Sequence, residues 1–153
     1  MNHIRNSIKA IIIKNNYLLV TKNRDSDGIF YLLPGGGQRH GETMRSALIR
    51  ECIEEIGVEV KVKDLSLVRE YIGRNHEFAE HDYDAHQIEH MFICDISDDA
   101  KPRNGIEPDG MQEDVSWIPL HKLSEYRIYP SILTKILQQL TKNQDLKYLG
   151  DVN

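Results

Sequence analysis

Three glutamates stand close together in the segment RECIEEI, at positions 51, 54 and 55. Apolar residues recur at helical spacing over residues 44–56, which predicts a helix there. On a helix, Glu51, Glu54 and Glu55 lie at i, i+3 and i+4 and therefore share one side. Because like charges at this spacing repel each other, the cluster indicates a bound cation. Carboxylate oxygens suit a hard ion such as Mg²⁺ or Mn²⁺.

Two simpler explanations compete with a bound cation. Arg50 lies four residues before Glu54 and could neutralise one carboxylate. The glutamates could also form an acidic helix face in water, as runs of charge usually do. The adjoining apolar arc of the helix would face a sheet, which places the carboxylates at the rim of the core. Partial burial there would raise their pKa values.

The spacing between the glutamates and residues outside the cluster helps to decide between these explanations. Seven residues stand at the separations of a known signature: Gly36, Glu42, Arg50, Glu51, Glu54, Glu55 and Gly57. Over residues 36–58 this pattern resembles the Nudix box, the signature of the Nudix (MutT-like) hydrolases. Cys52 departs from the signature mildly, because an aliphatic residue usually fills that position.

The resemblance implies Mg²⁺- or Mn²⁺-dependent hydrolysis of a nucleoside diphosphate linked to another group. The metal ligands would be Glu51, Glu54, Glu55 and the carbonyl of Gly36, or one glutamate would instead polarise the attacking water. Glycine suits position 36 because backbone without a side chain approaches a ligand closely. Bound metal neutralises a pyrophosphate, orients it and lowers the pKa of bound water, while a general base completes the attack.

Further catalytic roles follow from the same resemblance. Arg50 would orient a glutamate, and Glu42 would tie the preceding loop to the helix through Arg50; as a plain surface ion pair the two would contribute little. In this family the general base lies on the box helix or on a loop outside it. Glu113 is the candidate outside the box, and Glu107 and Asp109 are weaker ones. An exposed loop acid is the simpler explanation for each.

Residues outside the box are candidates for binding the substrate. Arg5 and Arg24 lie near the first strands and could contact a phosphate or a base, or be solvated arginines. Tyr71, Phe78 and Tyr83 could stack on a base, or pack against the protein. Subfamily patterns outside the box do not single out one substrate. A nucleoside triphosphate, an ADP-sugar and a dinucleoside polyphosphate all stay open.

Histidines alternate with acids in one part of the chain, at His76, His81, His86 and His90. Both residue types ligate zinc, but the spacing fits no tight pair of ligands, because residues 86 and 90 of a strand lie ~13 Å apart. We expect a polar loop over residues 73–85, and a lid that contacts substrate is the second interpretation.

These residues need a scaffold that combines strands and helices. Strands are expected at 7–13, 17–21, 29–33, 58–62, 65–72, 86–96 and 115–120. The first helix is capped by Thr43 and ended by Gly57, and a last helix begins near Pro130. Two helices on opposite faces of a mixed sheet predict an α/β (α+β) fold, an α/β/α sandwich of Nudix type. Residues 1–153 would form a single domain.

The composition limits the classes of partner that this protein is expected to bind. The formal charge of −5 argues against broad binding to nucleic acid or to an anionic membrane, but not against a small phosphorylated ligand. No apolar run reaches the ~20 residues that span a bilayer, and the first residues lack the features of a signal peptide. Cys52 and Cys94 are expected to be reduced and buried. We expect a cytoplasmic protein with a small nucleotide-type partner, and a homodimer stays open.

Two other functions compete with hydrolysis. A Nudix-fold sensor would bind a nucleotide without cleaving it, but such domains usually lose box carboxylates, which are all kept here. A metal buffer would use the histidine-rich residues 76–90 and would bind Zn²⁺ tightly without Glu54 and Glu55. Hydrolysis is the hypothesis that accounts for the whole box.

Overall fold

The computed structural model describes residues 3–140 and 145–153. Its strands are β1 (Arg5–Ile11), β2 (Ile13–Lys14), β3 (Tyr17–Asp25), β4 (Gly28–Leu32), β5 (Gly35–Gly37), β6 (Lys61–Ile72), β7 (His86–Asp95), β8 (Gln112–Pro119), β9 (Ile128–Tyr129) and β10 (Lys147–Asp151). Its α-helices are α1 (Met44–Ile56), α2 (Ala79–Asp82) and α3 (Leu133–Ile136). Short 3₁₀ turns cover Gly73–Asn75, Leu120–Glu125 and Leu137–Gln139.

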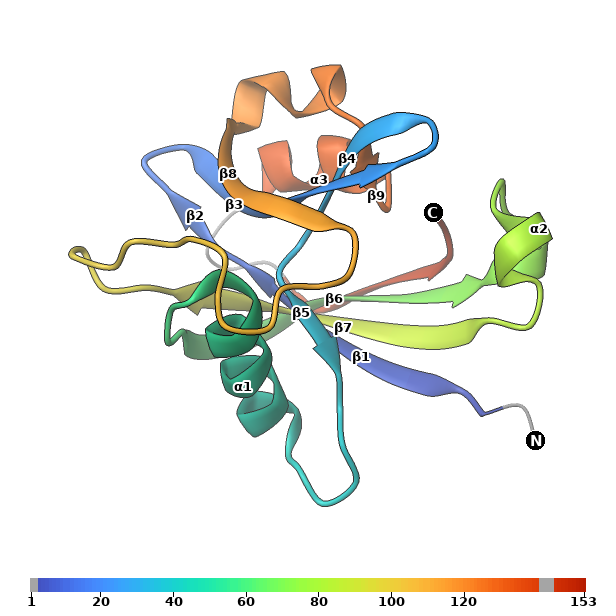
Figure 1. Cartoon of the computed structure of the whole chain (residues 1–153), viewed down its shortest axis with the longest axis horizontal. Coiled ribbons are helices and arrows are strands. Elements are labelled where there is room, and N and C mark those ends of the chain that lie inside the picture. Colours follow the sequence, from blue (N-terminus) through green and yellow to red (C-terminus); the bar gives the residue numbers. More distant parts are fainter. Residues whose placement is uncertain (1–2, 141–144) are drawn as a thin grey trace.

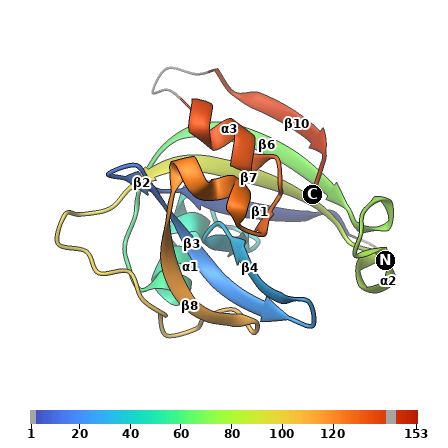
Figure 2. The ribbon, with the colours of Figure 1, turned by 90° about the horizontal axis from the view of Figure 1, so that it is seen from above.

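The strands form two mixed sheets (Figures 1 and 2). The first has the order β10-β6-β7-β1-β5, and the second has the order β2-β3-β4-β9 with β8 paired to β3. Strands β1 and β7 run parallel at the centre of the first sheet, while β5 pairs with β1 in the antiparallel sense. In Figure 1, α2 projects beyond the ends of β6 and β7, and α1 lies beside β5.

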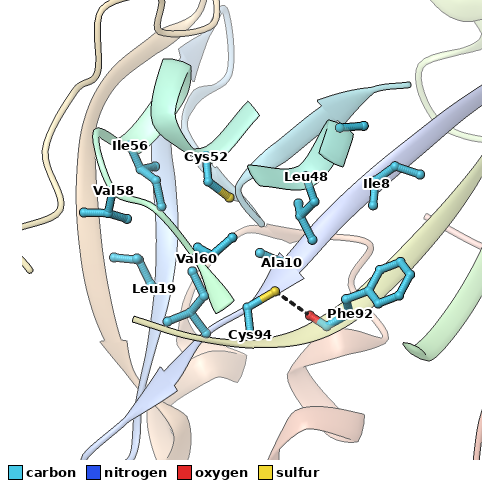
Figure 3. Packing of buried hydrophobic residues seen from close by; sticks show 12 residues of the cluster. Ile8, Ala10, Leu19, Leu48, Cys52, Ile56, Val58, Val60, Phe92 and Cys94 are labelled. Atoms are coloured by element: carbon cyan, nitrogen blue, oxygen red, sulfur yellow. Dashed lines mark hydrogen bonds between the residues drawn. The ribbon is translucent and has the colours of Figure 1, made fainter. Parts of the chain in front are cut away.

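Alternate residues of the central strands separate two cores. Ile8 and Phe92 belong to the core beneath α1, which Figure 3 shows. Ile11 and Met91 belong to the core on the other face, where they join Leu133 of α3. Burying such a side chain stabilises the fold by about 1.5–3 kcal/mol. The two helices therefore cover opposite faces of the first sheet, and the predicted mixed α/β fold is confirmed.

Helix α1 occupies the residues that the sequence predicts. The Thr43 hydroxyl accepts a hydrogen bond from the Ser46 N–H at 3.1 Å, and Gly57 ends the helix with a φ of 68°. Cys52 lies on the buried side of α1, and Cys94 of β7 is buried near it (Figure 3). Both thiols are free, and burial raises the pKa of each well above its usual value. The expectation of buried, unpaired cysteines is confirmed.

Some expected boundaries are wrong. Two expected strands are one strand, β6, whose pairing with β7 is irregular between Val62 and Leu67. The glycines at 35–37 form strand β5 instead of only ending β4, because backbone without side chains lies close against β1. The last helix is short and continues as a 3₁₀ turn. Strands β9 and β10 were not expected, since they are short and gain their stability from pairing with β4 and β6.

The expected loop at residues 73–85 has some structure of its own. It contains a 3₁₀ turn and the short helix α2, and the Gly73 N–H closes it by donating to the Ala85 carbonyl at 2.9 Å. Among residues 3–140 and 145–153, no helix has the length and apolar character needed to cross a membrane.

Candidate active site

A cavity of about 1020 Å³ is lined by both sheets, which is at the upper end of the usual size of ligand sites. Strands β1, β6 and β7 contribute its floor from the first sheet. Strands β4 and β9 contribute from the second sheet. The glycines of β5, two residues of α1 and the segment around α2 complete the wall.

Helix α1, which carries the three glutamates of the box, contributes two of them to the lining of this cavity. Glu51 and Glu55 line it beside Gly35 and Gly36 of β5. Glu55 is buried, and its Oε2 accepts a hydrogen bond from the Gly35 N–H at 3.2 Å. A Cβ atom on Gly36 would lie 2.5 Å from the Glu51 carboxylate, so a larger residue there would displace this carboxylate. Glu54 is not among the cavity residues.

Arg50 holds the loop and the helix together. Its Nε donates to Glu42 at 2.6 Å, and its Nη2 donates to the Gly37 carbonyl at 2.9 Å. Its Nη1 donates to Glu51 at 2.8 Å and to Glu54 at 3.3 Å. The hydrogen bonds from Arg50 lower the pKa of Glu42 to about 2. Glu42 therefore remains an anion that anchors Arg50 against the glutamates of α1.

Glu55 differs electrostatically from Glu42. Burial raises the pKa of Glu55 to about 7, and the nearby Asp109 and Glu51 carboxylates add to the shift. The Lys9 ammonium and the Gly35 N–H act in the opposite direction. A carboxylate that titrates near neutral pH is suited to accept a proton during a reaction.

The donor atoms at this site suit a hard divalent cation. Carboxylate oxygens of Glu51 and Glu55 face one cavity, and the Gly36 backbone lies against Glu51 without an intervening side chain. Within the described part of the chain, no group of three or more His, Cys, Asp or Glu side chains converges to hold a metal ion by itself. Mg²⁺ is commonly bound by one or two carboxylates together with substrate phosphates and water, so two carboxylates satisfy this requirement.

The three candidate acids outside the box differ in their positions. Glu113 does not line the cavity; it is exposed on β8 and forms an ion pair with Arg24. Glu107 and Asp109, the weaker candidates, lie at the cavity rim. Their loop is docked onto the end of α1, where the Glu107 N–H donates to the Glu54 carbonyl at 2.9 Å. Glu107 and Asp109 therefore line the cavity, whereas Glu113 pairs with Arg24 outside it.

The structure separates the candidate substrate contacts into two groups. Arg5 and Tyr71 line the cavity, whereas Arg24 and Tyr83 do not. Tyr71 is buried, and its hydroxyl donates to Asp82 at 2.8 Å. Tyr83 is 62% exposed. Phe78, the third aromatic candidate, also lines the cavity.

Sequence reasoning missed several cavity residues, namely Asp25, Phe30, Arg127 and Tyr129. Phe30 and Phe78 each meet Tyr129 edge-on, with ring centroids 6.1 and 5.3 Å apart. Arg127 donates two parallel hydrogen bonds to Asp25, at 2.8 and 2.7 Å. These residues come from distant segments, so no local pattern could have shown that they meet.

The histidines do not form a common site. His76 contacts Asp151 at 2.5 Å, and His86 contacts Glu70 at 3.4 Å. His81 lines the cavity separately. Since the described residues contain no cluster of possible ligands, the metal-buffer hypothesis gains no support.

Comparison with known proteins identifies the family of this chain. A sequence model of the NUDIX domain matches residues 3–140. The chain belongs to the NUDIX domain family. An ADP-ribose pyrophosphatase structure from Streptococcus suis superposes with a TM-score of 0.65 at 14% identity, covering 97% of this chain and 100% of that one. The structure of a NUDIX hydrolase from Nitrosomonas europaea superposes with a TM-score of 0.69 at 15% identity, covering 90% of this chain and 88% of that one. At such identities the likeness shows the fold alone.

Two curated relatives of this NUDIX chain are more informative. An ADP-ribose pyrophosphatase of Methanocaldococcus jannaschii is 35% identical over 104 residues, which are 62% of this chain and 57% of that protein. An RNA pyrophosphohydrolase of Campylobacter jejuni is 28% identical over 96 residues, which are 60% and 56% of the two chains. The match spans little more than half the length of these relatives.

Proposed function

We propose that this NUDIX protein is a divalent-metal-dependent hydrolase of a pyrophosphate bond in a nucleoside diphosphate derivative. Water would attack at phosphorus. The observation that carries the proposal is the meeting of Glu51, Glu55 and the Gly36 backbone in one cavity. The names of both curated relatives describe cleavage of pyrophosphate bonds, which supports the same chemistry.

The residues that would hold Mg²⁺ or Mn²⁺ are Glu51, Glu55 and the Gly36 carbonyl, with Glu54 as a further ligand. The bound ion would neutralise the pyrophosphate and lower the pKa of a bound water. Arg50 orients Glu51 and Glu54 through its hydrogen bonds to both carboxylates. The arginine would thus keep the ligands in place while the substrate enters.

Proton transfer and phosphate binding would fall to neighbouring groups. Asp109, which also lines the cavity, would accept the proton of the attacking water, or Glu55 would do so in place of binding the ion. Arg5 and Lys9 line the cavity from β1 and would bind the phosphate oxygens. Glu113 is left out of this scheme because it does not line the cavity.

The test is hydrolysis of a panel of nucleotides. Nucleoside triphosphates, ADP-ribose, dinucleoside polyphosphates and coenzyme A would each be incubated with Mg²⁺, with Mn²⁺ and with a chelator. We expect metal-dependent turnover that Glu55→Gln removes and that Glu59→Gln, at an exposed position just outside the box, leaves intact. Nucleotide binding without any turnover would instead identify a non-catalytic NUDIX sensor.

A further inference from the structure

The cavity distributes its positive charge unevenly. Four arginine or lysine side chains line it: Arg5, Lys9, Arg69 and Arg127. Arg5 makes no ion pair or hydrogen bond through its side chain within the described ranges, and the Lys9 ammonium bonds the Gly35 carbonyl at 3.1 Å. Both belong to β1, where Lys9 stands opposite Gly35 of β5. Free positive charge is therefore concentrated at what we call the glycine end: Arg5, Lys9, Gly35, Gly36, Glu51 and Glu55.

The other two cations are already neutralised. Arg69 and Glu89 form an ion pair on the cavity floor, and each is only 4% exposed. Arg69 Nη1 also donates to the Val152 carbonyl at 2.5 Å and to Asn153 at 3.2 Å. Its charge is therefore satisfied by the protein, and little of it remains for a ligand phosphate.

Arg127 is neutralised in a similar way. Its two Nη atoms donate to Asp25, and its Nε donates to the Tyr129 hydroxyl at 2.8 Å. The guanidinium also lies 5.3 Å from the ring centroids of both Phe30 and Tyr129. The hydrogen bonds from Arg127 lower the pKa of Asp25, so this carboxylate stays ionised and the pair stays neutral.

The wall around these pairs is acidic and aromatic. We call this region the paired end: Asp25, Asp27, Phe30, Arg69, Glu77, Phe78, Glu80, Glu89, Arg127 and Tyr129. A third or fourth phosphate there would meet carboxylates and no available cation, which is unfavourable at short range. Aromatic rings and carboxylate acceptors instead suit a flat base and groups that carry hydroxyls.

One buried carboxylate still has acceptor capacity. Ser7, Glu89 and Arg69 stand in one row across β1, β7 and β6. The second oxygen of Glu89, Oε1, receives only a long hydrogen bond of 3.3 Å from Gln87. A carboxylate oxygen accepts two hydrogen bonds, so a ligand hydroxyl can donate to Glu89 and a second to the buried Ser7 hydroxyl.

On the basis of the proposed hydrolase function, we propose that the substrate is a nucleoside diphosphate joined to a neutral, hydroxyl-bearing group, that is, a nucleoside diphosphate sugar. Its two phosphates lie at the glycine end. Its base stacks in the paired end on Phe30, Phe78 and Tyr129, and the hydroxyls of its sugar donate to Glu89 and Ser7. Nucleoside triphosphates, dinucleoside polyphosphates and triphosphate-ended RNA are poor substrates, because their extra phosphates find no free cation.

The first experiment compares kcat/KM with Mg²⁺ for ADP-ribose, UDP-glucose, ATP, diadenosine tetraphosphate and an RNA with a 5′-triphosphate. A diphosphate sugar should exceed every triphosphate or polyphosphate by at least about 100-fold. A preference for ATP, for the tetraphosphate or for the RNA would overturn the inference and leave the hydrolase function standing.

The second experiment makes the Arg127 charge available. Asp25→Asn removes the partner of this guanidinium, and it should raise kcat/KM for ATP relative to ADP-ribose by about tenfold. The matched control is Asp98→Asn, which breaks the ion pair between Asp98 and Lys14 outside the cavity and should leave the ratio unchanged. An unchanged ratio in Asp25→Asn would count against the charge argument.

A binding measurement separates the inference from the proposed function. Calorimetry with the Glu55→Gln protein and Mg²⁺ should show tighter binding of ADP-ribose than of ATP. This result without turnover by the natural chain would remove the hydrolase function and keep the inference. Tighter binding of ATP would overturn the inference, and binding of neither would overturn both.

Discussion

The two ends of the cavity share their walls but use charge in opposite ways. At the glycine end, Arg5 and Lys9 form no ion pair within 4 Å among the described residues, and Glu51 and Glu55 line the cavity beside them. At the paired end, each guanidinium already has its own carboxylate, as Arg127 has in Asp25. The comparison indicates that similar residue types are available to a ligand in one region and bound within the protein in the other. The difference lies in whether the charges are satisfied before a ligand arrives.

Removing one partner of the buried ion pair at the paired end is expected to destabilise the protein. Arg69 and Glu89 are almost fully buried, and breaking a buried ion pair by removing one partner costs about 3–5 kcal/mol of stability. The charges of the glycine end are mostly closer to water, with Glu55 as the exception. Substitutions that act on chemistry should therefore cluster at the glycine end.

The largest loss of activity is expected from Glu55→Gln, which changes a carboxylate of the glycine end to an amide. The amide cannot accept a proton or bind a divalent cation well, so kcat should fall by about 10³-fold or more. Steady-state kinetics with Mg²⁺ measures this loss, with Glu59→Gln as the control. A loss of less than tenfold would show that Glu55 is not part of the reaction.

A smaller loss of kcat is expected from Gly36→Ala. The new Cβ would lie 2.5 Å from the Glu51 carboxylate and force it to move, so kcat should fall by about 10–100-fold, as for displaced metal ligands in general. The control is Gly110→Ala, because nothing lies within 4 Å of the atom it adds. Equal activity of the two variants would argue against a ligand role for this strand. Circular dichroism would confirm that both variants fold.

The next prediction concerns the pH dependence of stability. Burial raises the pKa of Glu55 to about 7, so ionisation of this group opposes folding. The protein should lose up to about 3 kcal/mol as the pH rises from 4.5 to 7, and the loss is complete above pH 7. Urea unfolding in a chelator should show Glu55→Gln to be more stable than the natural chain at pH 8, and equal to it near pH 4.5.

Comparing the natural chain with Glu55→Gln also removes the contribution of Glu42 to the pH dependence of stability. The lowered pKa of Glu42 removes stability as the pH falls below 4.5, but it does so in both proteins. Only the difference between them reports Glu55. Mg²⁺ at pH 8 should reduce this difference by stabilising the natural chain, and a difference that does not vary with pH would contradict the assignment.

The smallest effect is expected from Glu113→Gln, which should change kcat by less than about twofold because an exposed ion pair contributes little. Asp109→Asn, on the same loop but at the cavity rim, should lower kcat by about 10–100-fold. The comparison is made by kinetics with saturating Mg²⁺. If Glu113→Gln were the more damaging change, the loop would have to adopt another position during the reaction.

Local signals predicted part of this molecule well. Helix α1 begins after Thr43 and ends before Gly57, because capping and helical periodicity depend on neighbouring residues only. The turn at Asn15–Asn16 also depends on local chemistry, because asparagine tolerates the positive φ angles that both residues have. Strand β10 could not be predicted in this way, since its polar sequence becomes a strand only by pairing with β6.

The sequence by itself determined the family and the group of residues proposed to bind the metal. Glu51, Glu54 and Glu55 share one side of a helix through spacing alone, and Gly36, Glu42 and Arg50 stand at the separations of the box. Only the tertiary structure decided which charges are left free. Arg127 and Asp25 are separated by 102 positions and meet because β3 and β9 both flank β4. Asp109 reaches the cavity because its loop docks onto α1. Such pairings depend on how distant segments pack, which no spacing along the chain encodes.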